Sequence, residues 1–399
     1  MKSVTLIFQV HQPLQFRRYR FFDIGADHSY YEVNSIKNQI QKLSEQCYIP
    51  ANDFLLRQVI QMEGKLKVAF YISGITLRLM REYAPEAMES FRKLGTTGCV
   101  EFLSGTYAYS LSSLAGPEAL QQEALRHRQT IGELIGCTSS IFYNTGLIYS
   151  DEIGAMLAGM GYQGVITEGA KHTLGWKTPG ALYGNPLYPH FKIFLRNSRL
   201  SNDLTFSDPF QTGGWDQFTH GQLLSGIVNS SPEDQLFNII LEYEDFGSVL
   251  PGKRKVFQFL DQLLFQVSRS QSVHFANPEE IAGAIRPDSL LHVPHPLSWS
   301  GDEHDLTCWN GNDLQQEAFS KLYELLPQIS RISDTGLFRD WSFLQESHHF
   351  IWMSTAEKPC SLHGQPNPYD SPFDAFINYM NILNDLKIRL DHIEATTEY

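Results

Sequence analysis

Three carboxylates stand within four residues, in Glu242-Tyr243-Glu244-Asp245, directly after the apolar run Leu236–Leu241. Successive side chains of an extended strand point to opposite faces, so this spacing predicts that Glu242 and Glu244 share one side. Neighbouring carboxylates raise each other's pKa, and a general acid that works at neutral pH needs a raised pKa. The cluster therefore favours acid–base chemistry of the kind that cleaves glycosidic bonds, although an ordinary acidic loop would have the same composition.

Two more polar residues accompany apolar runs near the N-terminus. His11 directly follows Val4–Val10. There it could hydrogen-bond a sugar hydroxyl or orient a carboxylate, and the alternative is a histidine that fixes a loop. Glu101 lies inside the run Cys99–Leu103, where strand alternation points it to the opposite side from its neighbours. It is a candidate carboxylate of a sheet interior, or a surface residue of a short strand.

Two later runs end in segments of different chemical character. Arg196 and Asp203 follow one run, where the arginine could clamp a carboxylate or a set of hydroxyls, with a solvated loop as the alternative. Gly146 follows Asn144 and Thr145 at the end of another run. Glycine supplies no functional group, so Gly146 by itself indicates a turn.

A tryptophan-rich segment follows in the last quarter of the chain. Trp299 and Trp309 flank several acids, among them Asp305. Two indoles and a carboxylate can stack on and hydrogen-bond a sugar chain. The alternative is a packed helix N-terminus with Asp305 near the helix dipole.

The elements that must position these residues are seven short apolar runs, most of them separated by enough chain for a helix. Continuous apolar runs are typical of strands buried on both faces, as in a parallel sheet. Polar residues at the ends of such strands are typical of the active face of a β/α barrel. The runs are Val4–Val10, Leu66–Ile72, Cys99–Leu103, Ser140–Tyr143, Gly164–Thr167, Phe191–Leu195 and Leu236–Leu241.

Helical patterns occupy several of the intervals and the end of the chain. Glu118–Ile135, Asp151–Met160 and Arg254–Ser268 are expected helices of the barrel, and the early insertion Ile24–Asp53 is expected to build the rim of its cleft. We predict a barrel domain over residues 1–285 and a helical domain over residues 286–399 that packs on the barrel mouth. The helical domain is predicted from periodicity in Leu314–Leu326, Asp340–Trp352 and Pro372–Leu390.

Composition excludes several classes of protein. The 399 residues carry a formal net charge of −13 with scattered lysines and arginines, which argues against nucleic-acid binding. No apolar run approaches the roughly 20 residues that span a bilayer. Five cysteines without a CxxC pair indicate reduced thiols and a cytoplasmic protein. Nucleotide, HExxH, His/Cys metal and GxSxG patterns are absent from the sequence, so neither a cofactor nor a metal is predicted.

The polar segments together resemble glycoside hydrolase family 57, specifically its α-amylase branch and the α-amylase-like homologues beside it. The resemblance extends over nearly the whole chain. It rests on five segments in order: His11-Gln12-Pro13, Gly98–Tyr107, Phe142–Tyr149, Leu241–Gly247 and Trp299–Gly311.

This resemblance implies an incomplete (β/α)7 barrel closed by a helical bundle. It also implies an α-glucan or maltooligosaccharide substrate, cleaved or transferred with retention by two carboxylates. At the family's nucleophile position this chain has Gly146, and at the general-acid position, normally Asp, it has Glu242. Retaining glycosidases need a second carboxylate about 5–5.5 Å from the acid, which glycine cannot supply.

Three hypotheses follow from these departures. The first is an α-glucan-binding homologue with weak or no retaining hydrolysis. The second is an active enzyme that inverts, with a water in the space left by the missing side chain and with Glu101, Glu168 or Asp203 as the base. The third is a non-catalytic regulatory or assembly protein that binds no glucan, with protein partners that the sequence does not identify.

Overall fold

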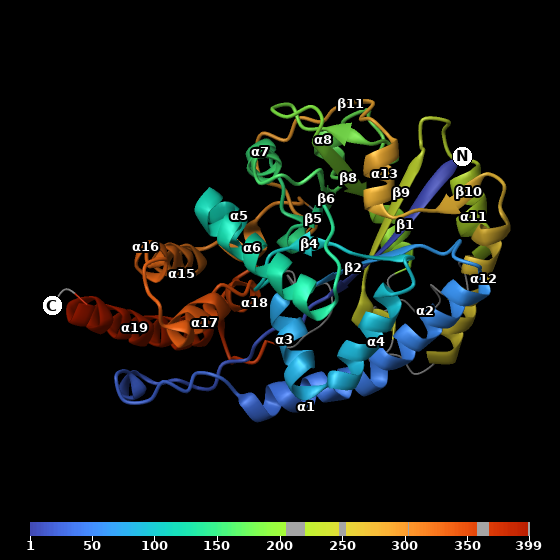
Figure 1. The fold of residues 1–399 in the computed structure, drawn as a ribbon. Coiled ribbons are helices and arrows are strands. Elements are labelled where there is room, and N and C mark those ends of the chain that lie inside the picture. Colours follow the sequence, from blue (N-terminus) through green and yellow to red (C-terminus); the bar gives the residue numbers. More distant parts are fainter. Residues whose placement is uncertain (205–219, 247–252, 302, 357–366, 398–399) are drawn as a thin grey trace.

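A ring of parallel β-strands surrounds a buried interior in the computed structural model, which describes residues 1–204, 220–246, 253–301, 303–356 and 367–397 (Figure 1). The ring strands are β1 (Lys2–Val10), β2 (Val68–Ile72), β3 (Val100–Phe102), β4 (Ser104–Gly105), β5 (Ile141–Tyr143), β6 (Gly164–Glu168), β8 (Lys192–Arg196) and β9 (Leu236–Glu242). Shorter strands at its edge are β7 (Tyr183–Gly184), β10 (Val273–Phe275) and β11 (Ser289–Leu290).

The hydrogen-bonded strand order nearly closes this ring. Neighbours follow the order β3-β2-β1-β9-β8-β6-β5-β4, and every pair along the path is parallel. The two ends of the path, β3 and β4, are separated only by Leu103. The join between β8 and β9 is short, with a single register pair between Arg196 and Asn238. All seven apolar runs therefore supply strands, and the predicted incomplete (β/α)7 barrel is confirmed.

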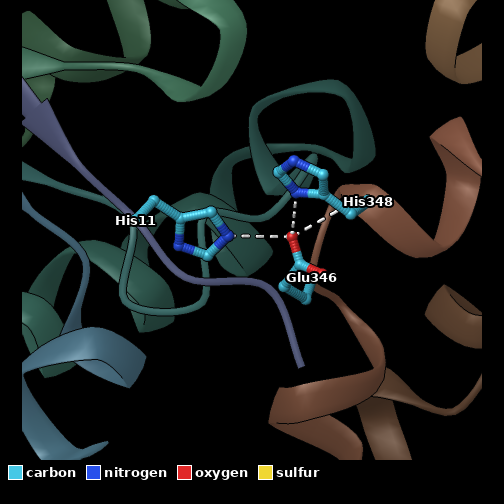
Figure 2. Close-up of side chains that lie close together, drawn as sticks. All are labelled: His11, Glu346 and His348. Carbon is cyan, nitrogen blue, oxygen red and sulfur yellow. Dashed lines mark hydrogen bonds and ion pairs between the residues drawn. The ribbon is translucent and has the colours of Figure 1, made fainter. Parts of the chain in front are cut away.

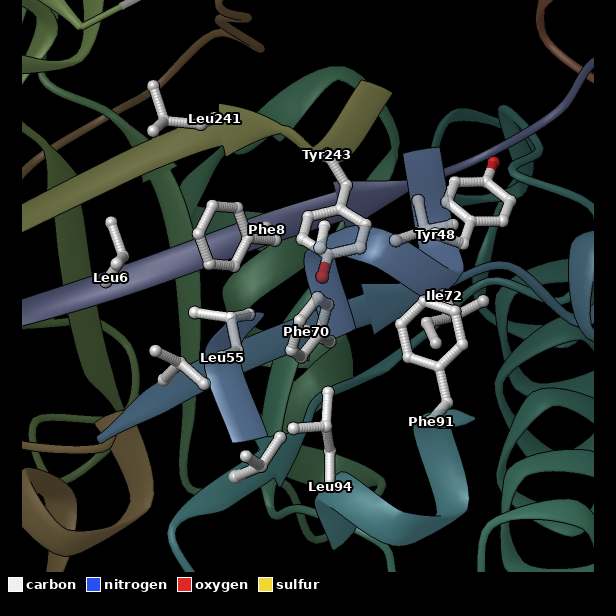
Figure 3. Close-up of a cluster of buried hydrophobic side chains, with 14 of the residues drawn as sticks. Leu6, Phe8, Tyr48, Leu55, Phe70, Ile72, Phe91, Leu94, Leu241 and Tyr243 are labelled. Atoms are coloured by element: carbon white, nitrogen blue, oxygen red, sulfur yellow. The ribbon is translucent and has the colours of Figure 1, made fainter. Parts of the chain in front are cut away.

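Both faces of the strands are buried, as continuous apolar runs require. Ile7, Tyr71 and Ile240 belong to the cluster inside the ring. Their sequence neighbours point outward: Phe8 and Phe70 pack with ring centroids 5.3 Å apart in a separate cluster beneath the covering helices (Figure 3). Alternation thus assigns each strand residue either to the helix-covered layer or to the barrel interior.

Helices fill the intervals between the strands. Those predicted at Glu118–Ile135, Asp151–Met160 and Arg254–Ser268 are confirmed as α6, α7 and α12. The helices of this region are α1 (Val33–Leu43), α2 (Ile49–Gln61), α3 (Gly74–Tyr83), α4 (Pro85–Gly95), α5 (Ser112–Ala115), α6 (Pro117–Leu134), α7 (Asp151–Gly159), α8 (Lys171–Leu174), α9 (Ser198–Asp203), α11 (His220–Val228), α12 (Lys253–Arg269) and α13 (Pro278–Ala284). Short 3-10 or π turns are η1 (Phe21–Asp23), η2 (Ser44–Tyr48), η3 (Thr145–Leu147) and η4 (Tyr243–Phe246).

The last part of the chain is helical and lies beside the barrel (Figure 1). Its helices are α14 (Thr307–Asn310), α15 (Asp313–Tyr323), α16 (Leu326–Ile329), α17 (Thr335–Leu344), α18 (His348–Ile351) and α19 (Pro372–Thr397). The continuous helix expected over Asp340–Trp352 is instead broken between α17 and α18. The boundary at residue 285 stays a prediction, because the chain after it still pairs with the barrel region, for example Leu297 with Tyr149.

The early insertion Ile24–Asp53 is mostly helical, comprising α1, η2 and the start of α2. Its first residues dock on α19 through Asp385. That carboxylate accepts hydrogen bonds from the backbone N–H of Gly25 at 2.6 Å and from Nδ1 of His28 at 2.8 Å. The insertion therefore links the barrel to the C-terminal helices.

Two observations bear on the predictions from composition. Within the described ranges, no helix has both the length and the apolar character needed to cross a membrane. Cys47, Cys99 and Cys137 are free thiols. Cys308 is disulfide-bonded, so the expectation of reduced thiols throughout the chain is wrong.

Candidate active site

Gln9 lies at the centre of the polar side chains that gather at the carboxyl ends of the strands. Its Oε1 accepts hydrogen bonds from the hydroxyls of Tyr109 at 3.0 Å and Tyr143 at 2.7 Å. Its Nε2 donates to Oε1 of Glu242 at 3.4 Å. Gln9 and Glu242 are register partners on β1 and β9, and they share the side of the strands that carries Ile7 and Ile240 in the interior cluster. Glu242 is therefore presented at the mouth of the barrel and held there by its neighbour.

Glu244 has different hydrogen-bond partners from Glu242, and the prediction that the two side chains share one side stays a prediction. The strand ends at Glu242 and the chain enters the 3-10 turn η4, which breaks the two-residue period. Glu244 instead accepts hydrogen bonds from the Tyr48 hydroxyl at 2.6 Å and from Gln12 Nε2 at 3.1 Å. Burial, with a smaller contribution from the charge of Glu242, raises the pKa of Glu244 to about 8. The side chain of Asp245 lies outside the described structure.

The position of Gly146 is closed over by an indole ring. Gly146 has φ +59°, and a Cβ placed on it would lie 2.7 Å from both Cη2 and Cζ2 of Trp309. The Trp309 ring packs edge-to-face against Trp299, with ring centroids 6.1 Å apart. The backbone N–H of Trp299 donates to the Gly146 carbonyl at 3.0 Å. The hypothesis of an inverting enzyme needs a water in the space beside Gly146. In the direction of a Cβ, Trp309 occupies that space.

The other residues of this C-terminal segment are engaged in packing and capping. Trp309 is only 1% exposed. Asp305 is exposed, and its carboxylate accepts hydrogen bonds from the N–H of Thr307 at 2.9 Å and its hydroxyl at 2.7 Å, at the start of α14. Trp299 remains partly exposed. Contact of these three side chains with a sugar stays a prediction.

Glu101 lies at the opposite end of the barrel from Glu242. It is buried inside the ring near the amino ends of the strands, where it accepts hydrogen bonds from the Ser139 hydroxyl at 2.6 Å and the Glu279 N–H at 3.1 Å. Ser139 precedes β5, and Glu279 is in the first turn of α13. We therefore do not include Glu101 in the proposed site.

The buried Glu101 predicts a pH-dependent stability. Burial raises the pKa of Glu101 from 4.5 to about 7, so the folded protein holds this proton more tightly than the unfolded chain does. Stability from this group is present below the unfolded pKa and is lost as the pH rises from about 4.5 to 7. The wild type should lose unfolding free energy from this group between about pH 5 and pH 8, and Glu101→Gln should reduce that loss by on the order of 3 kcal/mol.

Urea denaturation of the wild type and of Glu101→Gln at both pH values checks this expectation. Glu317 is exposed on α15, so Glu317→Gln serves as the control and should keep the wild-type pH dependence. Identical pH dependence in the wild type and Glu101→Gln would contradict the expected effect.

The two remaining candidate bases, Glu168 and Asp203, lie in different environments. Glu168 is buried at the end of β6, and its Oε2 pairs with Arg196 at 3.0 Å. Its other oxygen accepts hydrogen bonds from the Ser198 hydroxyl and the Gly169 N–H. Asp203 is exposed at the end of α9, 3.9 Å from Arg199. The mouth therefore holds Arg196 and Glu168 as an ion pair, while Asp203 lies on a surface helix.

His11 forms a buried cluster with two residues that the sequence analysis missed, Glu346 and His348 (Figure 2). Oε1 of Glu346 lies 3.0 Å from His11 Nε2 and 2.7 Å from His348 Nδ1. Burial lowers the pKa of His11. Burial alone would raise the pKa of Glu346, but the two histidines hold it well below its usual range. Because Glu346 lies in the break between α17 and α18, helical periodicity gave no signal for it.

Comparison with known proteins agrees with this architecture, a β/α barrel whose polar site lies at the carboxyl ends of its strands. Residues 5–294 match the family model of glycosyl hydrolase family 57. The chain therefore belongs to that family.

Individual relatives are distant in sequence. A Methanocaldococcus jannaschii protein named "Putative alpha-amylase" is 28% identical over 99% of this chain and 86% of its own length. A family 57 branching enzyme from Thermococcus kodakaraensis superimposes with a TM-score of 0.72 over 98% of this chain and 90% of its own, at 12% identity. A 4-alpha-glucanotransferase from Thermococcus litoralis superimposes with a TM-score of 0.64 at 12% identity. The match covers 88% of this chain and 59% of that enzyme's length. At these identities the two structures support the fold alone.

Proposed function

We propose that this protein binds α-glucans at the mouth of its barrel and does not hydrolyse them by the retaining mechanism. The observation that carries the proposal is the packing of Trp309 against the position where Gly146 would bear a Cβ. A retaining enzyme needs a nucleophilic carboxylate about 5–5.5 Å from its acid. At Gly146 there is neither a carboxylate nor space for one.

Family membership and the presence of a carboxylate, Glu242, at the general-acid position support glucan binding. Relatives named for α-amylase, branching and glucanotransferase activity share the family or the fold. Glu242 remains at the mouth with the hydrogen-bonding groups of Gln9, Tyr109 and Tyr143 around it. Carboxylates and phenols of this kind hydrogen-bond sugar hydroxyls.

Calorimetric titration with maltoheptaose, together with a reducing-end assay on the same sugar, tests this proposal. We expect binding without release of reducing ends. Glu242→Gln should weaken binding by about tenfold or more, because hydrogen bonds to a charged group contribute more than neutral ones. Glu317→Gln, on the exposed face of α15, is the matched control and should bind as the wild type does.

Three outcomes would contradict the proposal, and each points to a different alternative. Robust hydrolysis with retention, abolished by Glu242→Gln, would show an intact retaining enzyme. Release of β product from an α-linked substrate would show an inverting enzyme. Failure to bind any oligosaccharide, together with a stable complex in pull-downs, would favour a regulatory or assembly role.

A further inference from the structure

Three ligand-type atoms from distant parts of the chain converge beside the barrel mouth. One ligand atom from each of His11, Glu346 and His348 lies within 4.8 Å of the other two (Figure 2). His11 follows β1, whereas Glu346 lies in the break between α17 and α18 and His348 is the first residue of α18. The separation of 335 residues between His11 and Glu346 explains why no local metal-binding spacing appears in the sequence.

The chemistry of the three donors selects one class of ion. Two imidazole nitrogens and one carboxylate oxygen are the donors that Zn²⁺ and similar transition-metal ions prefer. Calcium and magnesium prefer sites made of oxygen ligands alone. His11 and Glu346 are buried, and His348 is largely so, so these side chains are not a solvated surface cluster.

A second observation points to a bound partner at the same place. The other carboxylate oxygen of Glu346, Oε2, is buried without a hydrogen-bond partner. The side chain itself is 0% exposed. Around it, both amide atoms of Gln345, the Ser347 hydroxyl and Nε2 of His349 are also buried and unpartnered. Buried polar atoms are normally satisfied, so this concentration over residues 345–349 marks a place where a polar ligand is expected.

Surrounding contacts hold two of the donors in position. Nδ1 of His11 lies 2.8 Å from the Ser73 hydroxyl. When Nδ1 carries the proton and donates it to Ser73, Nε2 presents its lone pair, which is the usual outer-shell arrangement of a metal-binding histidine. The His11 ring stacks on Tyr109 at 4.4 Å, and the Tyr109 carbonyl accepts a hydrogen bond from the N–H of Ser347 at 3.2 Å. Tyr109 thus braces His11 and the Glu346 turn together.

We propose that His11, Glu346 and His348 bind one divalent transition-metal ion of the zinc class. Three protein ligands leave a further coordination position for water or another polar group, as in open rather than closed zinc sites. The site is adjacent to the proposed glucan site, because Tyr109 also donates to Gln9 at 3.0 Å and accepts from the N–H of Gly146 at 3.3 Å.

Zinc titration of the chelator-stripped full chain tests the site, with isothermal calorimetry for affinity and elemental analysis after dialysis for stoichiometry. We expect one equivalent of Zn²⁺ per wild-type chain. Glu346→Gln and His348→Gln should each weaken binding by about 100-fold or more. Co²⁺ in place of Zn²⁺ should give visible d–d absorption in the wild type that is lost in both variants.

The matched control is His292→Gln, which removes a histidine that also pairs with a carboxylate, Asp151, at 2.6 Å but is 73% exposed. It should bind Zn²⁺ as the wild type does. Because Glu346 is buried, circular dichroism must show a folded variant; His348→Gln, at a partly exposed position, provides the second test. Absence of stoichiometric zinc in the wild type, or wild-type affinity in both site variants, as zinc held by the free thiols would give, would overturn the proposal.

Discussion

Gly146→Glu alone is expected to leave the protein without hydrolysis of maltoheptaose and to destabilise it. Any residue other than glycine must adopt φ +59° there, and its Cβ would lie 2.7 Å from two atoms of the rigid Trp309 ring. The left-handed backbone costs about 1–2 kcal/mol, and overpacking of a buried site typically costs about 1–3 kcal/mol. We therefore expect Gly146→Ala, the smallest such change, to lower the unfolding free energy by about 2–5 kcal/mol.

Two control glycines separate the backbone contribution from the clash. Gly98 also has a positive φ, +67°, but nothing lies within 4 Å of an added Cβ, so Gly98→Ala should show the backbone contribution alone. Gly283, in α13, has open space and no positive φ. Its alanine variant should be neutral or slightly stabilising. Urea denaturation measures all three variants.

Combining Gly146→Ala with Trp309→Ala tests whether the Trp309 ring is what prevents a side chain at position 146. Removing a buried tryptophan costs about 3–5 kcal/mol by itself, but the clash disappears with it. The double variant should therefore lose clearly less stability than the sum of the single variants. Hydrolysis by Gly146→Glu with Trp309 in place would contradict the packing argument.

Arg196→Met is expected to lower the unfolding free energy by about 3–5 kcal/mol, because it leaves the buried carboxylate of Glu168 without its counter-ion. Arg196 pairs with Glu168 at 3.0 Å and also donates to Asn202 Oδ1 at 2.6 Å. The side chains of the pair are 8% and 0% exposed, so solvent offers little compensation. Urea denaturation near neutral pH measures the loss.

The matched control is Arg199→Met in the same segment. Arg199 is 87% exposed and lies 3.9 Å from Asp203, and exposed ion pairs contribute about 0–1 kcal/mol. Replacing both members of the buried pair, Arg196→Met with Glu168→Leu, should recover much of the stability, because no unpaired charge remains. Equal losses for Arg196→Met and Arg199→Met would contradict the role assigned to the buried pair.

The barrel could be predicted because its signal is local. A strand buried on both faces must be apolar along its length, so each run from Val4–Val10 to Leu236–Leu241 marked a strand without reference to any other. The motif order likewise predicted the family. Alternation gives no information beyond Glu242, because the strand ends there and the turn η4 follows.

The sequence by itself determined the strands, the helices of the barrel and the absence of a side chain at Gly146. It did not determine the surroundings of that glycine, because Trp309 reaches it from a segment more than a hundred residues away in the sequence. The cluster of His11, Glu346 and His348 likewise exists only after the C-terminal helices dock beside β1. Periodicity reports which face of an element is buried, whereas contacts between distant segments depend on how the elements pack, and only the tertiary structure decides that.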